Sequence, residues 1–125
     1  MATALPTLRN DEEQVLSTAV ARIADLWDLT NGQLGSILGM SGPSASRLRS
    51  GKLMLEVRSK AFEAGQYLLR LFRSLDALMG SDDQTSRAWL RTPNLDLERP
   101  PIELLSTFTG LSRVCDYVDG FRARV

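Results

Sequence analysis

Apolar residues recur at steps of three and four along most of this 125-residue chain, which is the spacing of amphipathic helices. The first stripe covers residues 15–27, in a helix that Asn10 caps after a lead-in of residues 1–10. A second stripe, over residues 56–79, is wide enough to pack on two sides. No stretch alternates convincingly enough to be a strand. The pattern therefore predicts an all-α fold with a long central helix.

Two short helices of about eight residues are predicted between these long ones, joined by a three-residue turn that contains glycine. Thr30 offers a cap for the first short helix, and Ser41 caps the second, with Pro43 in its first turn. Gly35 lies where the first helix must approach the second, and Gly39 in the turn needs a positive φ. This spacing is typical of a helix-turn-helix. A helical hairpin without a DNA role has the same spacing, so the distribution of charge is needed to distinguish the two.

The charge distribution favours a local contact with DNA. The chain has 15 basic and 15 acidic residues, so no global field attracts it to nucleic acid. Residues 41–60, however, hold five basic residues and only one acidic residue. Gly42 and Pro43 leave little for base readout, so phosphate contacts dominate, and useful affinity requires dimerisation. The candidate DNA-binding residues are Ser41, Ser44, Arg47, Arg49 and Lys52.

The end of the chain, residues 81–125, is predicted to form a small helical domain after a helix-turn-helix domain of residues 11–80. Ser81 begins its first helix through a capping box, and this helix must end before Pro93. Residues 92–100 are expected to be irregular.

The rest of this domain is predicted from two leucines, a proline and a glycine. Leu95 and Leu97 are expected to be tucked in, because both lie in the irregular segment next to apolar helices. Pro101 opens the next helix. Gly110 ends that helix, and a last helix follows to the end of the chain.

No constellation of residues suggests catalysis or metal binding. Histidine is absent, and the carboxylates lack the spacing of metal ligands. The single cysteine, Cys115, lies among apolar residues, which predicts a buried thiol in a reducing compartment. Residues 1–10 do not have the pattern of a signal peptide, and no apolar run could span a bilayer. We expect a cytoplasmic protein that is not an enzyme and has no cofactor.

A more specific pattern lies in residues 89–94, Trp-Leu-Arg-Thr-Pro-Asn, and in residues 101–107, Pro-Ile-Glu-Leu-Leu-Ser-Thr, followed by Gly110 and Val114. It resembles the C-terminal toxin-binding domain of the Xre/MbcA/ParS family of antitoxins. The helix-turn-helix upstream resembles that of phage-repressor (Xre-type) proteins. The resemblance therefore covers about residues 11–125.

The resemblance implies an all-helical antitoxin with an Xre-like helix-turn-helix, whose C-terminal domain packs over a toxin and blocks its active site. Such toxins consume NAD and are commonly of the RES-domain type. The N-terminal part is expected to dimerise and to bind operator DNA, so that a hetero-oligomeric complex represses its own operon. This chain departs from the family where Leu97-Glu98-Arg99 replaces a paired glycine, and where Arg124 stands near the end instead of glycine.

The apolar residues of the motif are expected to form core, and exposed polar or terminal residues to meet the toxin. Arginines and a terminal carboxylate suit a cleft built for a phosphorylated dinucleotide. The candidate toxin-binding residues are Arg91, Asn94, Glu103, Arg113, Tyr117, Arg122, Arg124 and Val125.

Two other interpretations stay open at this point. The chain could be an Xre-type transcriptional regulator without a toxin partner. It could also be an adaptor with a relic helix-turn-helix that no longer binds DNA, for which Gly42 and Pro43 are the main support.

Overall fold

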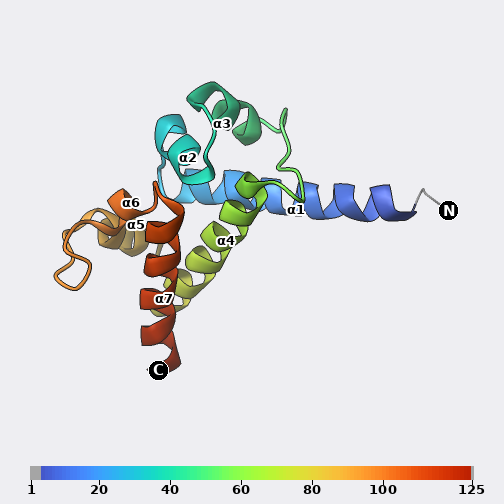
Figure 1. Ribbon diagram of the computed structural model, residues 1–125. Helices are drawn as coiled ribbons and strands as arrows, with labels where there is room; N and C mark the ends of the chain where they lie inside the picture. The colour runs from blue at the N-terminus through green and yellow to red at the C-terminus, as the bar shows by residue number, and fades with distance from the viewer. Residues whose placement is uncertain (1–3, 125) are drawn as a thin grey trace.

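The computed structural model describes residues 4–124, with side chains described from residue 11 to residue 123. This part of the chain folds into helices joined by turns and loops, and it contains no strand beyond an isolated β-bridge. The all-α fold predicted from the sequence is confirmed. In chain order the helices are α1 (Ala4–Leu26), α2 (Asn31–Leu38), α3 (Gly42–Arg49), α4 (Lys60–Leu78), α5 (Asp83–Arg91), α6 (Pro101–Leu104) and α7 (Phe108–Arg124) (Figure 1).

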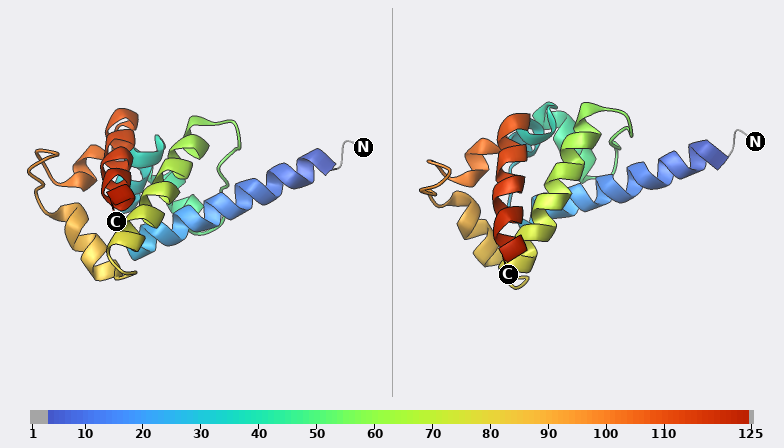
Figure 2. Two further views of the ribbon diagram at one scale, coloured as in Figure 1. Left: turned by 90° about the horizontal axis from the view of Figure 1, so that it is seen from below. Right: turned by 60° about the horizontal axis from the view of Figure 1, so that its bottom comes forward.

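The core lies where α4 meets α1 on one side and α7 on the other. Figure 2 shows α4 and α7 side by side, with α1 crossing α4 and extending beyond the other helices at its N-terminal end. Gly65 makes the crossing possible, because a Cβ there would lie 3.1 Å from Leu55 Cδ1 and 3.3 Å from Val20 Cγ2. Burial of leucines along α4 contributes to the driving force for folding, at about 25 cal/mol per Å² of apolar surface. The fully buried ones are Leu68, Leu71 and Leu75.

The predicted helix-turn-helix is confirmed in its helices and caps. Thr30 caps α2 in a full capping box, and the Ser41 hydroxyl caps α3 by accepting from an N–H in its first turn. Gly39 has a φ of 73° in the turn, as expected. A Cβ at Gly35 would lie 2.5 Å from the carbonyl oxygen of Met40. The small residue at position 35 therefore makes room for the turn itself.

The starts of the two long helices α1 and α4 differ from the sequence-based prediction. Helix α1 begins at Ala4, before the Asn10 cap, and residues 1–3 of the predicted lead-in lie outside the described residues. Pro6 falls in the first turn, where proline costs no hydrogen bond. Helix α4 begins at Lys60, because Ser59 caps it and the segment before it is drawn across α1.

Hydrogen bonds to α1 explain why residues 53–59 are not helical. The Leu55 N–H donates to the Ser17 hydroxyl at 2.8 Å, and the Val57 N–H donates to the Glu13 carboxylate at 2.9 Å. These bonds fix the segment against α1 before the Ser59 cap begins the helix. The apolar pattern continued through this segment, so the pattern alone placed the start of α4 too early.

Helix α5 is capped by Asp82, one residue later than predicted. The Asp82 carboxylate accepts the hydroxyl of Thr85 and the backbone N–H groups of Gln84 and Thr85, and these bonds lower its pKa. Ser81 instead adopts a φ of 62°, and its hydroxyl donates to Asp76 at 3.0 Å. The helix ends at Arg91, before Pro93 as predicted.

The end of the domain also departs from the prediction. Helix α6 ends at Leu104 and α7 begins at Phe108, so Gly110 lies inside α7 and does not end the preceding helix. A Cβ at Gly110 would collide with the carbonyl group of Leu104. Glycine is needed here because α6 ends directly against the first turn of α7.

Candidate functional site

The loop between α5 and α6, residues 92–100, is a hydrogen-bonded structure that extends from the body of the molecule (Figure 1). The Asn94 side-chain oxygen accepts the N–H groups of Asp96 at 2.9 Å and Leu97 at 3.1 Å. The Glu98 N–H donates to the Asn94 carbonyl at 2.7 Å, and Glu98 has a φ of 71°. Leu97 is buried, as predicted. The loop is therefore closed by its own contacts.

Helix α7 anchors this loop through Asp96. The Tyr117 hydroxyl donates to the Asp96 carboxylate at 2.7 Å, and the Arg113 guanidinium lies 3.4 Å from the Asp96 carbonyl oxygen. The bond to Asp96, followed by burial, raises the pKa of Tyr117. The structure thus brings together Asn94, Arg113 and Tyr117, which the sequence analysis selected separately.

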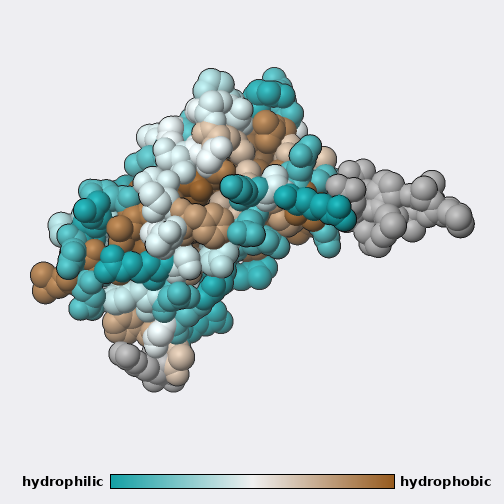
Figure 3. All heavy atoms as spheres, in the orientation of Figure 1, coloured by the Kyte–Doolittle hydropathy of each residue, from teal (hydrophilic) through white to brown (hydrophobic). Residues whose placement is uncertain are grey.

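Leu95 projects from the tip of the anchored loop. Its side chain is 98% exposed, so the prediction that Leu95 is tucked in is wrong. On the face in Figure 3, hydrophobic atoms stand out at the end of the molecule where this loop extends. A single exposed leucine is common on protein surfaces. A loop fixed on both sides of it, however, presents this side chain in a defined position.

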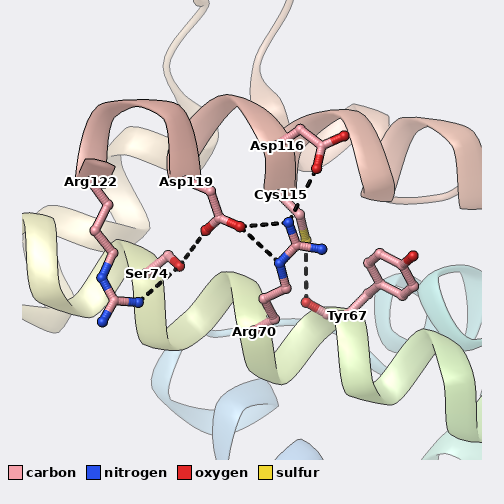
Figure 4. A network of polar contacts seen from close by, with 7 residues as sticks. All are labelled: Tyr67, Arg70, Ser74, Cys115, Asp116, Asp119 and Arg122. Atoms are coloured by element: carbon pink, nitrogen blue, oxygen red, sulfur yellow. Dashed lines mark hydrogen bonds and ion pairs between the residues drawn. The ribbon is translucent and has the colours of Figure 1, made fainter. Parts of the chain in front are cut away.

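A polar network joins α7 to α4 on the other side of α7 (Figure 4). The Arg70 guanidinium donates to Asp119 at 2.8 Å and to Asp116 at 3.1 Å, and the Ser74 hydroxyl donates to Asp119 at 2.6 Å. Burial opposes the charge on Asp119, but the bonds from Ser74 and Arg70 outweigh it and lower the pKa of that carboxyl. Arg122 reaches the Ser74 hydroxyl at 3.4 Å.

Cys115 lies beneath this network with its thiol directed at α4. The thiol donates to the Tyr67 carbonyl oxygen at 3.3 Å, and burial raises its pKa from 9.0 to about 11. The predicted burial of Cys115 is confirmed. The thiol is therefore held neutral and buried, as is typical of structural cysteines.

The remaining predicted toxin contacts lie apart from the loop. Glu103 on α6 lines a groove that faces α2, across from Gln33 and Ser36. Arg91 turns its guanidinium toward the end of α1. The side chains of Arg124 and Val125 lie outside those that the structure describes.

Arginines from two regions hold the end of α1. Arg87 of α5 donates to the Leu26 carbonyl at 2.8 Å, and Arg91 donates to the carbonyls of Trp27 at 2.7 Å and Asp28 at 3.0 Å. Arg49 of α3 donates to the next carbonyl, that of Leu29, at 2.6 Å. Arg87 was not among the predicted site residues, because nothing in its sequence neighbours indicates a contact 61 residues away.

The predicted DNA-binding residues divide into exposed and engaged groups. Arg47 and Lys52 are exposed at the end of the helix-turn-helix. Ser41 and Ser44 form the start of α3, where the Ser41 hydroxyl donates to Ser44 at 3.1 Å. Arg49 is half-buried, since it also pairs with Asp25 at 2.7 Å. Its guanidinium is therefore held by α1 and the turn before α2.

A further groove runs between the N-terminal part of α1 and α4. Its acidic residues, Asp11 and Glu12, come from α1, and its basic residues, Arg70 and Arg73, come from α4. Val15 within it is 68% exposed. The apolar residues of this groove are Val15, Leu16, Val57, Phe62 and Leu69.

The described residues contain no cluster of Cys, Asp and Glu that could hold a metal ion.

Comparison with known families accounts for both halves of the chain. The family described as antitoxin Xre-like helix-turn-helix domain matches residues 7–73. The family described as antitoxin Xre/MbcA/ParS C-terminal toxin-binding domain matches residues 74–124. These matches meet inside α4, and a domain boundary after Gly80 stays a prediction. No curated protein gives a significant match to the chain.

Proposed function

The chain belongs to the Xre/MbcA/ParS-type antitoxins, and from this premise we propose that it neutralises a RES-type, NAD-consuming toxin by covering the toxin's active site. The observation that supports this proposal best is the pair of end-to-end matches, since the second is to a toxin-binding domain. The resemblance of residues 89–107 to that domain supplies the class of toxin. The proposed partner is therefore the protein encoded by the gene next to the one that encodes this chain.

The surface that we propose for the toxin is the anchored loop with the adjoining face of α7. Leu95 supplies an apolar side chain, and Asn94, Arg113 and Tyr117 surround the base of the loop. Interfaces gain most from a few apolar or aromatic groups that enter a pocket inside a polar rim. The loop needs little ordering on binding, which favours affinity.

The end of α7 is the proposed plug for the active site. Arg122 is exposed there, and Arg124 and Val125 follow it in the sequence. A cleft that binds a phosphorylated dinucleotide carries groups that compensate the charges of its substrate. The arginines at this end of α7 are suited to the acidic groups of such a cleft.

The toxin proposal is tested with the purified product of the neighbouring gene. We expect it to co-purify with the chain and to consume NAD only when the chain is absent. A chain that ends at Gly120 should keep its helical content and its binding through Leu95, but should inhibit poorly. Full inhibition by this truncated chain would contradict the plug, and failure of the full chain to bind would contradict the whole proposal.

We also propose that the helix-turn-helix binds operator DNA and represses the chain's own operon. Arg47 and Lys52 are exposed, and Ser41 and Ser44 lie at the start of α3, where backbone contacts to phosphate are common. In a mobility shift with the DNA upstream of the chain's own coding sequence, binding should weaken steeply between two salt concentrations. Arg47→Ala should lower the salt slope by about 1. Equal binding to unrelated DNA would contradict this function.

The operator-binding form is proposed to be a homodimer joined through the α1–α4 groove. A symmetric pair places the same patch of each copy against the other. The acids of α1 could then meet Arg73 on the second copy, over the shared apolar floor. In analytical ultracentrifugation we expect the wild-type chain to sediment as a dimer and Val15→Arg to sediment as a monomer. A Val15→Arg chain that stays dimeric would contradict this arrangement.

A further inference from the structure

The end of α1 is held from two sides by arginines that come from different parts of the chain. Arg87 and Arg91, which donate to the carbonyls of residues 26–28, belong to the region that matches a toxin-binding domain. Arg49, which donates to the carbonyl of Leu29, belongs to the second helix of the helix-turn-helix. The carbonyls of residues 26–28 are thus bonded by the toxin-binding region, and the next carbonyl, that of Leu29, is bonded by the helix-turn-helix.

The physics of a helix end explains why arginine is suited to this place. The last carbonyls of an α-helix have no partner within the helix, and they carry the negative end of its dipole. At the end of α1 the chain turns sharply, with Asp28 at a φ of 54°. A guanidinium has fixed, planar donors, so Arg91 can bond the carbonyls of Trp27 and Asp28 together.

This segment also determines where the helix-turn-helix sits. It connects α1 directly to the Thr30 cap of α2. Arg49 fixes α3 to the same place through Asp25 at 2.7 Å and the Asn31 side chain at 3.2 Å. A shift of the segment therefore moves α2 and α3 relative to α1.

We propose that Arg87 and Arg91 are positioning residues for DNA binding, through which the toxin-binding region sets the orientation of the helix-turn-helix. This inference rests on the proposed binding of operator DNA. A dimeric helix-turn-helix must present its second helices at the spacing of two half-sites, so a small rotation of α3 weakens binding to both. Arg87 and Arg91 act through the carbonyls of residues 26–28 and need no contact with DNA.

A charge-preserving variant separates this role from a direct phosphate contact. Lysine keeps the positive charge at position 91 but cannot reproduce the planar, two-carbonyl contact of the guanidinium. A phosphate contact would survive Arg91→Lys and would be lost in Arg91→Ala with a lower salt slope. Positioning through the carbonyls of Trp27 and Asp28 predicts that both variants lose affinity and that the salt slope stays the same.

The first test is a mobility shift at several salt concentrations, with the full chain and the duplex upstream of its own coding sequence. We expect Arg91→Ala and Arg91→Lys each to weaken binding about tenfold, the scale of charged hydrogen bonds. Arg99→Ala removes the same charge from an exposed position in the loop of residues 92–100, and it should bind as wild type. Wild-type affinity in either Arg91 variant would overturn the proposal.

The second test measures amide hydrogen exchange, which requires no DNA. Arg91→Ala should speed exchange in residues 27–38 at least fivefold, with α7 unchanged, whereas Arg99→Ala should leave both unchanged. Unchanged exchange in residues 27–38 overturns the positioning role. If exchange rises but the wild-type chain does not bind the duplex, the proposed DNA-binding function fails, and the positioning role for DNA fails with it.

Discussion

The Tyr117 hydroxyl donates a hydrogen bond of 2.7 Å to the Asp96 carboxylate and so ties α7 to the loop that carries Leu95. Because this bond raises the pKa of Tyr117, the contact is intact at neutral pH and is lost only as pH rises through that raised pKa. The loop and the helix therefore present one surface under physiological conditions.

Tyr117→Phe removes this anchor without changing the ring. We expect toxin affinity to fall about tenfold, the scale of one hydrogen bond to a charged group, while the helical content stays unchanged. Tyr67→Phe removes a hydroxyl from α4 instead and serves as the matched control in titration calorimetry. Equal affinity for the two variants would show that the anchor does not contribute to binding.

Leu95→Ser tests the apolar tip of the loop directly. Because Leu95 is 98% exposed, its loss should leave the free energy of unfolding unchanged. If the side chain enters a pocket on the toxin, affinity should fall at least about tenfold. Met54→Ser changes another exposed apolar residue, in the segment before α4, and should keep wild-type affinity for the toxin. A Leu95→Ser chain that binds as tightly as wild type would remove Leu95 from the interface.

Local signals in the sequence predicted the helix-turn-helix well, because its caps, turn glycine and spacing all act over a few residues. The start of α4 was misplaced, since contacts with Ser17 and Glu13 bind the preceding segment to α1. Long-range contacts of this kind leave no mark on local periodicity.

The candidate site shows the same limit. Asn94, Arg113 and Tyr117 were selected as polar residues near a motif, and the structure gathers them at Asp96. Leu95 was misassigned, because an apolar residue in a loop can face either way and only the fold decides. The role of Arg91 at the end of α1 depends on a contact between residues 64 positions apart.

Two glycines of α7 should respond to alanine in opposite ways. Gly110→Ala forces a Cβ against the Leu104 carbonyl group and should lower the free energy of unfolding by about 2 kcal/mol. Gly120→Ala meets open space in the same helix and should raise it by about 1 kcal/mol through helix propensity. Urea denaturation measures both. A stable Gly110→Ala chain would contradict the close packing of α6 on α7.

Cys115 should make the folded state sensitive to alkaline pH. Its thiol is neutral in both states below pH 9, so it has no effect there. Between pH 9 and about 11 the unfolded chain loses this proton while the folded chain keeps it, so the free energy of unfolding falls as pH rises. Cys115→Ala should lose less stability across this range, with lysine and tyrosine titration common to both proteins. Parallel pH curves would contradict the raised pKa.

The most direct test of the central claim is the NAD content of cells that express the neighbouring gene with and without this chain. The account predicts that NAD collapses when the neighbouring gene is expressed alone, and that it stays at its normal level when the chain is co-expressed. An equal collapse in both cultures, with the chain present and folded, would contradict the claim that this protein neutralises an NAD-consuming toxin.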